Sequence, residues 1–400
     1  MKSRLLSILS LLFFATVIVT LILHLSYPTF HFVNPPPFRG NTLSNPYENV
    51  DFSKPEIVNF HGHTKAWGGL TNGKYTQAFA SKRYDSLGYT LTYLSQYHKI
   101  EKPVKAENDF SVYEHGINVK KTHQLILGNR DVVWKDYLLP QNRHQKQHIL
   151  NLLASDTNNI VVLNHPGIRG GYTLDDMKYL QNYDMIEVLR PNGNFMAYLD
   201  TALSYGHPVS IMANDDFHNV ANNKEVGNCL TIVYTSNEKK RYSVLLSMKK
   251  RRTAAVQLNQ NLNSNLKERA AKISRMQKLI QSISLAKDTI TIAVNEPMQI
   301  TWKGQAGSIK TVKNKTVDKL IFPATETYVR LELTTHDNIV IFLNPIIRTE
   351  SDKIPSRATL ASTYTKKDKI FLATLINNPY MLLTTLILLF WKPLFKKKER

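Results

Sequence analysis

The chain has 400 residues, with 51 Lys and Arg against 31 Asp and Glu and a formal net charge of +20. Its single cysteine, Cys229, excludes an intrachain disulfide framework and a zinc site built from several thiolates of one chain. A basic excess of this size is typical of nucleic-acid-binding proteins, but much of it lies in residues 249–252 and 392–400. No basic groove with interleaved aromatic residues is visible, so we assign the charge to juxtamembrane and surface lysines, with no specific nucleic-acid site.

Two apolar segments flank the chain. Residues 5–26 are almost entirely apolar, follow Lys2 and Arg4, and are long enough to span a bilayer. A cleaved signal peptide is the alternative, but no small-x-small cleavage site follows, so we predict an uncleaved anchor. Residues 370–391 predict a second transmembrane helix, although Asn377-Asn378-Pro379 interrupt it. Basic residues outside both segments predict an integral membrane protein with two spans, cytoplasmic termini and an extracytoplasmic main domain.

A His-x-His motif follows the first strand-like run after the anchor. Residues 56–60 read as a buried strand, and His61-Gly62-His63 come at its carboxyl end. An i, i+2 spacing places both imidazoles on one face of an extended chain, where they can bind one metal ion. The motif is weak alone, since surface histidines often have this spacing.

Strands alternate with helices from the motif to residue 256, after a linker at residues 27–55. We expect strands at 57–60, 88–94, 110–113, 124–128, 160–163, 185–189 and 208–212, and helices at 75–87, 148–153, 174–179 and 195–205. This alternation predicts a parallel sheet, whose strand ends share one rim when the sheet closes into a barrel. Metal-competent side chains recur at these ends: His61, His63, His98, Glu114, His123, His165, Asp216 and His218.

In order and spacing, these motifs resemble the PHP (polymerase and histidinol phosphatase) family over residues 56–256. The matching elements are His61-Gly62-His63, the region of His98, Glu114 with His123, Asn164-His165-Pro166 and Asp216-Phe217-His218. The resemblance implies a distorted (β/α)7 TIM-like barrel that binds divalent ions at its rim and hydrolyses phosphoesters. It assigns the eight strand-end residues as ligands of one to three ions, with Zn, Mn or Fe as the candidates.

Two positions depart from the family pattern. Asn72 stands where an acidic or histidine ligand usually follows the first motif, and Gln96-Tyr97-His98 lacks the carboxylate expected directly before the histidine. An amide is neutral and a weak ligand for Zn or Mn, which predicts that one metal position is weakened or absent. Two ions still suffice for in-line displacement.

The chemistry implied by the resemblance is attack of a metal-activated water on phosphorus. Glu114 would bridge ions and serve as a catalytic residue, and Arg169, in the loop after His165, would bind phosphate bidentately. The alternative for Arg169 is a solvated loop arginine. Neighbouring His115 and Asp215 point away from the site if the chain is extended, so we leave them out of the ligand set.

The carboxy-terminal half changes pattern. Apolar residues at helical spacing in residues 257–287 predict a helical insertion. Short alternating runs in residues 288–350 predict a small antiparallel β-sandwich-like domain. Some PHP-like proteins carry such a module ending in an Asn-Pro-Ile sequence, which Asn344-Pro345-Ile346 matches.

Three functions compete. The leading hypothesis is a membrane-anchored extracytoplasmic metal-dependent phosphoesterase, acting on a small-molecule or polymeric phosphoester. The second is a catalytically degenerate PHP-like module that binds a ligand or partner at the membrane surface, which Asn72 and Gln96 favour. The third, a nucleic-acid-binding membrane protein, rests on net charge alone.

Overall fold

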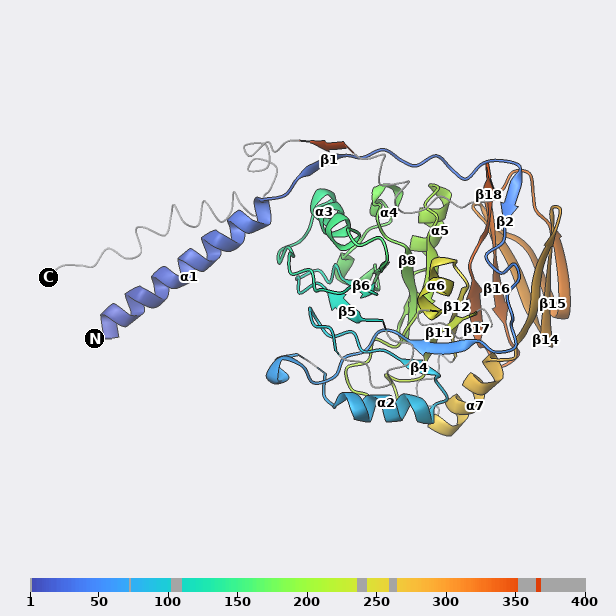
Figure 1. Cartoon of the computed structure of the whole chain (residues 1–400), viewed down its shortest axis with the longest axis horizontal. Coiled ribbons are helices and arrows are strands. Elements are labelled where there is room, and N and C mark those ends of the chain that lie inside the picture. Colours follow the sequence, from blue (N-terminus) through green and yellow to red (C-terminus); the bar gives the residue numbers. More distant parts are fainter. Residues whose placement is uncertain are drawn as a thin grey trace.

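The structure is a computed structural model that describes residues 2–71, 73–101, 110–235, 243–258, 265–351 and the backbone of 365–367. Two large β-sheets form the body, with helices on its outside (Figure 1). The helices of the described part are α1 (Lys2–Leu25), α2 (Gln77–Ser86), α3 (Arg143–Leu153), α4 (Asp176–Tyr179), α5 (Met196–Ser204), α6 (Ser243–Lys249) and α7 (Leu266–Met276).

The smaller sheet has six strands, in the order β10-β8-β7-β6-β5 with β9 paired to β8. Its strands are β5 (Val112–His115), β6 (Gln124–Leu127), β7 (Ile160–Leu163), β8 (Met185–Arg190), β9 (Gly193–Asn194) and β10 (Ser210–Ala213). Strands β7, β8 and β10 are parallel, whereas β6 is antiparallel to both neighbours. The strands β7 and β10 are buried on both faces, which explains the continuous apolar sequence of β7 and the apolar residues 211–213 of β10.

The larger sheet has eleven strands, with the main order β13-β14-β16-β17-β12-β11-β3-β4. These strands are β3 (Glu56–Asn59), β4 (Leu91–Thr92), β11 (Cys229–Val233), β12 (Thr253–Gln257), β13 (Ile280–Ala286), β14 (Thr289–Gly304), β16 (Tyr328–Thr334) and β17 (Val340–Leu343). Strand β15 (Gly307–Ile321) pairs with β14, and β18 (Ile346–Thr349) joins β16 to β2 (Thr42–Ser44). A separate pair joins β1 (Thr29–His31) to β19 (Thr365–Lys367).

The predicted distorted (β/α)7 barrel is wrong, because the two sheets do not close into one. Within the part of the chain that the structure describes, strand pairing between the two sheets is limited to isolated bridges at their ends, Gly62 to Phe217 and Tyr97 to Glu114. Side chains replace ladder bonds at one junction: Asn214 Oδ1 accepts from the Phe60 amide at 2.7 Å, and Asn59 Oδ1 accepts from the Asp215 amide at 3.1 Å. Amide side chains satisfy the backbone there without strand pairing.

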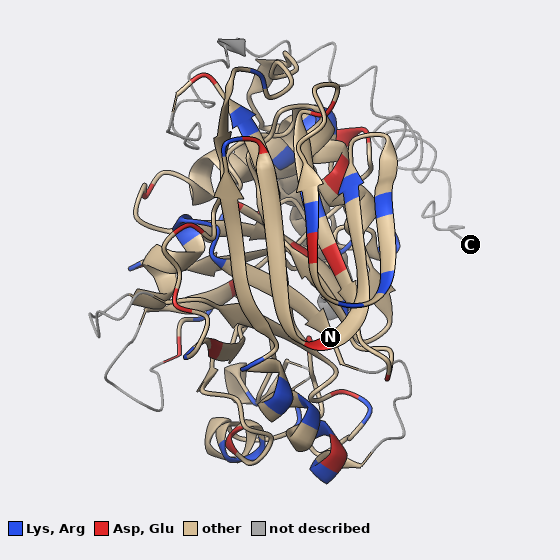
Figure 2. Cartoon of the chain, turned by 90° about the vertical axis from the view of Figure 1, so that its right-hand side faces the viewer, with Lys and Arg blue, Asp and Glu red and all other residues tan. Residues whose placement is uncertain are grey.

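The small separate C-terminal β domain is also not observed as a sheet of its own. Strand β17 pairs with β12, so β13–β17 extend the same sheet that contains β11 and β3. The described part of residues 257–287 contains α7 followed by β13, so the predicted helical insertion also includes a strand. Charged residues of both signs are interspersed along the outer strands of this sheet (Figure 2), where Lys310 pairs with Asp318 at 2.7 Å.

Within the described residues, one helix is long and apolar enough to cross a membrane. Its apolar window, Ile8–Leu25, has a mean hydropathy of 2.6 and only 6% of it is buried. Helix α1 projects from the body (Figure 1), and a signal sequence would meet the same criterion of length and apolarity. The second predicted span, residues 370–391, lies outside the described residues, so a pair of flanking transmembrane helices is not shown.

Local capping explains where two helices begin. Thr76 accepts a hydrogen bond from the Phe79 amide at the start of α2. Asn142 and Gln145 form a reciprocal capping box at the start of α3. These caps orient the helices that cover the sheets.

Candidate metal centre

The buried ends of several strands bring histidines and carboxylates into one cluster. His61 and His63 follow β3, Glu114 lies in β5, His123 precedes β6, His165 follows β7, and Asp216 and His218 follow β10. All except His218 are at most 9% exposed, and the His218 side chain is 27% exposed. Seven of the eight residues predicted as ligands therefore lie together.

Glu114 is at the centre of the cluster. Its Oε1 lies 2.9 Å from His123 Nδ1, 3.3 Å from His61 Nε2 and 3.6 Å from His165 Nε2. Its Oε2 lies 3.2 Å from His63 Nε2. One carboxylate thus faces four imidazoles from three segments of the chain.

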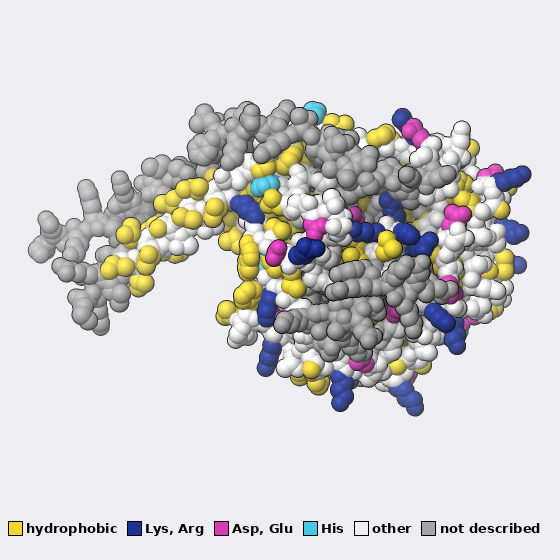
Figure 3. Space-filling view, in the orientation of Figure 1, with side chains coloured by type: hydrophobic (Ala, Val, Ile, Leu, Met, Phe, Trp, Pro, Cys, Tyr) yellow, Lys and Arg dark blue, Asp and Glu magenta, His cyan; other side chains and the backbone are white. Residues whose placement is uncertain are grey.

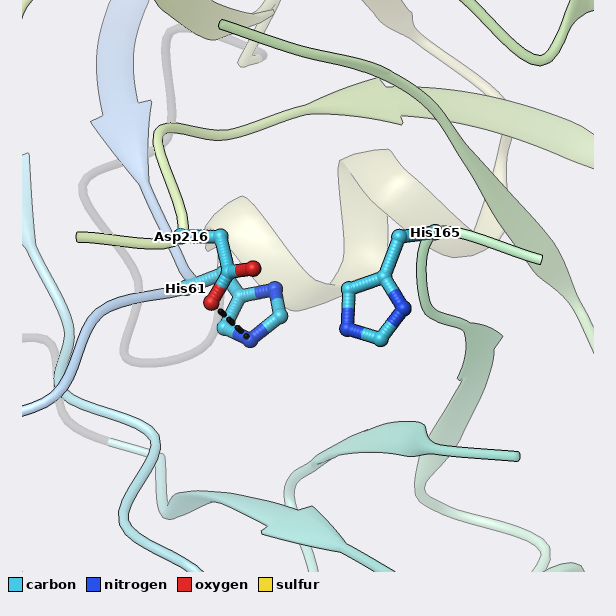
Figure 4. A group of neighbouring side chains, drawn as sticks. All are labelled: His61, His165 and Asp216. Atoms are coloured by element: carbon cyan, nitrogen blue, oxygen red, sulfur yellow. Dashed lines mark ion pairs between the residues drawn. The ribbon is translucent and has the colours of Figure 1, made fainter. Parts of the chain in front are cut away.

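Asp216 forms the other carboxylate face. Its Oδ1 lies 3.2 Å from His61 Nε2 and 3.6 Å from His63 Nε2. Figure 4 shows Asp216 beside His61, with His165 facing them from another segment. Arg190, from the end of β8, approaches Asp216 from the other side, with Nη2 3.3 Å from Oδ2.

The potential ligand atoms form four overlapping groups, in each of which the atoms lie within 4.8 Å of one another. The groups are His61, His63 and Glu114; Glu114, His123 and His165; His61, His165 and Asp216; and His63, Asp216 and His218. Glu114 and Asp216 each belong to two groups, which is the arrangement needed for a carboxylate shared between ions. These buried groups are close enough to hold a metal ion.

Several cluster atoms are buried without a hydrogen-bond partner. They are His61 Nε2, both ring nitrogens of His63, Glu114 Oε2, His123 Nε2 and His165 Nδ1. Buried polar atoms are normally satisfied, so unmatched imidazole nitrogens beside carboxylates fit divalent-cation ligation. Glu114, Asp216 and Glu187 carry more negative charge than Arg190 balances; without an ion, the raised pKa values of His61 and His63 let protons offset this charge, and a bound cation would take the place of those protons.

The carboxylates and imidazoles perturb one another strongly. Burial alone lowers the pKa of His61, but the charges of Asp216, Glu187 and Glu114 outweigh it and raise the pKa well above its usual value. Burial raises the pKa of Glu114, yet His123 and His61 reverse this and hold it well below its usual range. The pKa of His123 is lowered by burial, which favours the neutral form that binds metal.

Two of the clustered residues have unusual backbones. His165 has φ of 28° and Asp216 has φ of 49°, values that L residues rarely adopt. Such backbones cluster at functional sites, where surrounding contacts maintain them. Gly62, between the two histidines of the motif, is required for another reason: a Cβ there would lie 2.0 Å from the Phe217 ring.

Sequence reasoning missed the residues that orient the cluster. Glu187 in β8 accepts from His61 Nδ1 at 2.9 Å and from the His165 amide at 3.0 Å. Asn164 donates to Glu114 Oε1 at 3.0 Å, and Asn214 donates to Glu187 Oε1 at 3.0 Å. The available signal was a lone carboxylate inside the apolar run of β8, since a buried charge requires partners.

The structure leaves His98 outside the cluster. Its Nδ1 lies 3.2 Å from the Val133 carbonyl, and its Nε2 accepts from the Gly116 amide at 3.1 Å. Both nitrogens are therefore engaged with the backbone, and burial lowers the pKa of the ring to about 4.

Other predicted positions also separate from the cluster. Arg169 is exposed in a 3-10 turn, Ile168–Gly170, and Arg190 instead reaches the carboxylates. Asp215 faces away, accepting from Tyr84 and from the amides of residues 227–229. Gln96 hydrogen-bonds with Thr64 rather than facing the cluster, and Asn72 lies outside the described residues.

Comparison with known proteins assigns no family. No protein-family model matches the chain, and neither the curated proteins nor the solved structures give a match. The function must therefore be argued from the cluster itself.

Proposed function

We propose that the protein is a metal-dependent phosphoesterase of the PHP type, held at a membrane by α1 with its body outside the cytoplasm. The observation that carries the proposal is the pair of buried carboxylates, Glu114 and Asp216, each shared between two three-residue ligand groups. Shared carboxylates between imidazoles support binding of more than one divalent ion. The mixed histidine and carboxylate donors favour Zn, Mn or Fe over Mg or Ca.

Bound divalent ions in such a cluster supply Lewis-acid activation of water and of a phosphoryl oxygen. The chain's own residues prepare that cluster. Glu187 holds His61 through Nδ1 and so directs Nε2 toward Glu114 and Asp216. Asn164 fixes Glu114 Oε1 by donating to it, which limits the rotation of the central carboxylate.

Arg190 is the residue placed to bind the substrate anion. Its Nη2 lies 3.3 Å from Asp216 Oδ2, its side chain is 26% exposed, and its buried Nε has no hydrogen-bond partner. A guanidinium beside a metal cluster, with a free donor, suits bidentate recognition of a phosphoryl group. We therefore assign to Arg190 the role first given to Arg169.

A second candidate function is a catalytically degenerate module that binds a ligand at the same place. Gln96 and Tyr97 favour it, because neither residue before His98 supplies a carboxylate. The Tyr97 ring instead stacks on the His63 ring, with 4.6 Å between the ring centroids. This function predicts anion binding without turnover.

The test uses the full-length protein purified after growth with Zn, Mn and Fe. We expect bound metal by elemental analysis and hydrolysis of p-nitrophenyl phosphate. Arg190→Gln should raise KM by about tenfold or more through loss of a charged hydrogen bond. The matched control Arg169→Gln, which removes an exposed guanidinium, should change KM little. Absence of both metal and turnover would transfer support to the binding module.

A further inference from the structure

Large apolar side chains are exposed beside the metal cluster. Leu70 is 92% exposed and Trp134 is 65% exposed. We name the set the apolar rim: Trp67, Leu70, Ile117, Val119, Trp134 and Leu138. The Trp67 and Trp134 rings meet edge to face at 5.9 Å, and the Val119 amide donates to the Leu138 carbonyl at 3.0 Å. Grouped exposed apolar residues mark interaction surfaces.

The apolar rim is connected to the metal cluster through Tyr97. Trp67 Nε1 donates to the Tyr97 carbonyl at 2.8 Å. The Tyr97 ring in turn stacks on His63 at 4.6 Å. Whatever covers the rim therefore lies at the edge of the site.

Two buried histidines outside the cluster hold residues 132–138, which we name the rim loop, in place. His98 Nδ1 lies 3.2 Å from the Val133 carbonyl, and His115 Nε2 lies 2.8 Å from the Lys135 carbonyl. The Trp134 ring stacks on His98 at 5.6 Å. The exposed indole is thus presented by a loop anchored on both sides, which explains what these two histidines do.

The same loop contacts the end of the apolar helix. Lys135 Nζ donates to the Leu23 carbonyl at 3.3 Å, and Tyr137 donates to the Ser26 carbonyl at 3.4 Å. Hydrophobic side chains gather on the part of the body beside the end of α1 (Figure 3). If α1 enters a bilayer, this end lies at the membrane–water interface, and the rim loop lies there with it.

The composition of the rim matches that interface. Tryptophans concentrate at the headgroup level of membranes, and lysines attract anionic lipids. Lys120 and Lys121 follow Val119 of the apolar rim in the sequence, and Lys135 follows Trp134. The rim thus combines exposed apolar side chains with the positive charge of exposed Lys120 and of half-buried Lys121 and Lys135.

We propose that the apolar rim inserts into the headgroup region of the bilayer that α1 enters, and that the cluster acts on a phosphoester carried by a membrane lipid. The second part rests on the proposed phosphoesterase function. In the reaction, a water oxygen forms the new bond to phosphorus, the ester P–O bond breaks, and the departing oxygen takes a proton.

Insertion is tested on the full-length chain in vesicles of equimolar phosphatidylcholine and phosphatidylglycerol. A nitroxide label is attached at Leu70→Cys, with unsubstituted protein as the labelling control because Cys229 is buried. The matched control is Ile321→Cys, an equally apolar site in β15 that is 65% exposed. We expect the label at 70 to be accessible to oxygen and protected from a water-soluble nickel complex. Equal protection at both sites overturns the insertion.

The substrate class is tested with Leu70→Asp and Ile117→Asp, again against Ile321→Asp. The probes are fluorescent phosphatidic acid in vesicles and p-nitrophenyl phosphate in solution. We expect the rim variants to lower the ratio of lipid to soluble turnover by about tenfold. An unchanged ratio overturns the lipid substrate. No turnover of either probe overturns the phosphoesterase function, while a protected label at 70 still supports the membrane surface.

Discussion

The metal cluster and the large sheet bury polar groups in different ways. In the large sheet the carboxylates meet donors: Arg330 holds Asp200 of α5 through two contacts of 2.7 Å, and Trp302 Nε1 and Lys310 Nζ each donate to Asp318 at 2.7 Å. In the cluster, Glu114 faces four imidazoles, and several of the buried ring nitrogens have no hydrogen-bond partner.

Paired polar groups, as in the large sheet, contribute to the structure, whereas unpaired ligand atoms, as in the cluster, are available to bind an ion. Arg330 and Asp200 join two donors to two acceptors within the protein, and the remaining Arg330 Nη1 lies 3.8 Å from Glu332, so the pair contributes to stability and offers no open ligand set to a cation. An excess of unmatched ligand atoms instead costs stability unless a cation joins them. Replacing one carboxylate should therefore lower metal affinity in the cluster and lower the free energy of unfolding in the large sheet.

The largest effect is expected from Glu114→Gln. The neutral amide removes one charge from two ligand groups at once. Loss of a residue that only hydrogen-bonds to a metal ligand lowers metal affinity by roughly 10- to 100-fold, so loss of a ligand should lower it at least as much. Competition with a chelator, followed by elemental analysis, measures the change. His336→Gln, at an exposed histidine, is the control. Full metal retention in Glu114→Gln would exclude Glu114 as a shared ligand.

The sequence indicated the cluster better than the fold that carries it. Histidines after short apolar runs were visible at His61, His63 and His165, because strand ends follow from local composition. Glu187 and Arg190 were not visible, because their role depends on which strand neighbours β8. Barrel closure failed for a similar reason: Asn59 and Asn214 satisfy the backbone at the junction through side chains, which no periodicity reveals.

The outer strands show the same limit. Two of the short alternating runs in residues 288–350, residues 289–294 and 298–302, belong to one strand, β14, whose register shifts between Ala293 and Met298 around Pro297. Strand β15 was not predicted, because most of its residues are exposed and it carries no clear apolar alternation.

An intermediate effect is expected from Asp200→Asn in the other region. The Arg330 side chain is only 2% exposed, and its next carboxylate, Glu332, lies 3.8 Å away. Because the Asp200 side chain is 36% exposed, the loss is discounted to about 2 kcal/mol in the free energy of unfolding. Urea denaturation in the presence of chelator measures the loss. The control is Glu350→Gln, which breaks the exposed ion pair between Glu350 and Arg39. Metal content should not change; a fall in bound metal would contradict the separation of the two regions.

The smallest effect is expected from a histidine that has no carboxylate around it. His207 Nε2 bonds to the Lys178 carbonyl at 3.0 Å, and burial lowers the pKa of the ring from 6.5 to about 4. The unfolded chain therefore takes up a proton as the pH falls below 6.5, whereas the folded chain does so only near 4, and stability is lost across this window. His207→Gln keeps a donor for the Lys178 carbonyl and removes the titration. Between neutral pH and about pH 5.5, the wild type should lose about 1 kcal/mol more than the variant in urea denaturation. His336→Gln should follow the wild type. Parallel pH profiles for His207→Gln and the wild type would show that His207 is not held neutral. The lowered pKa of this isolated histidine would then not contrast with the raised pKa of His61 in the cluster.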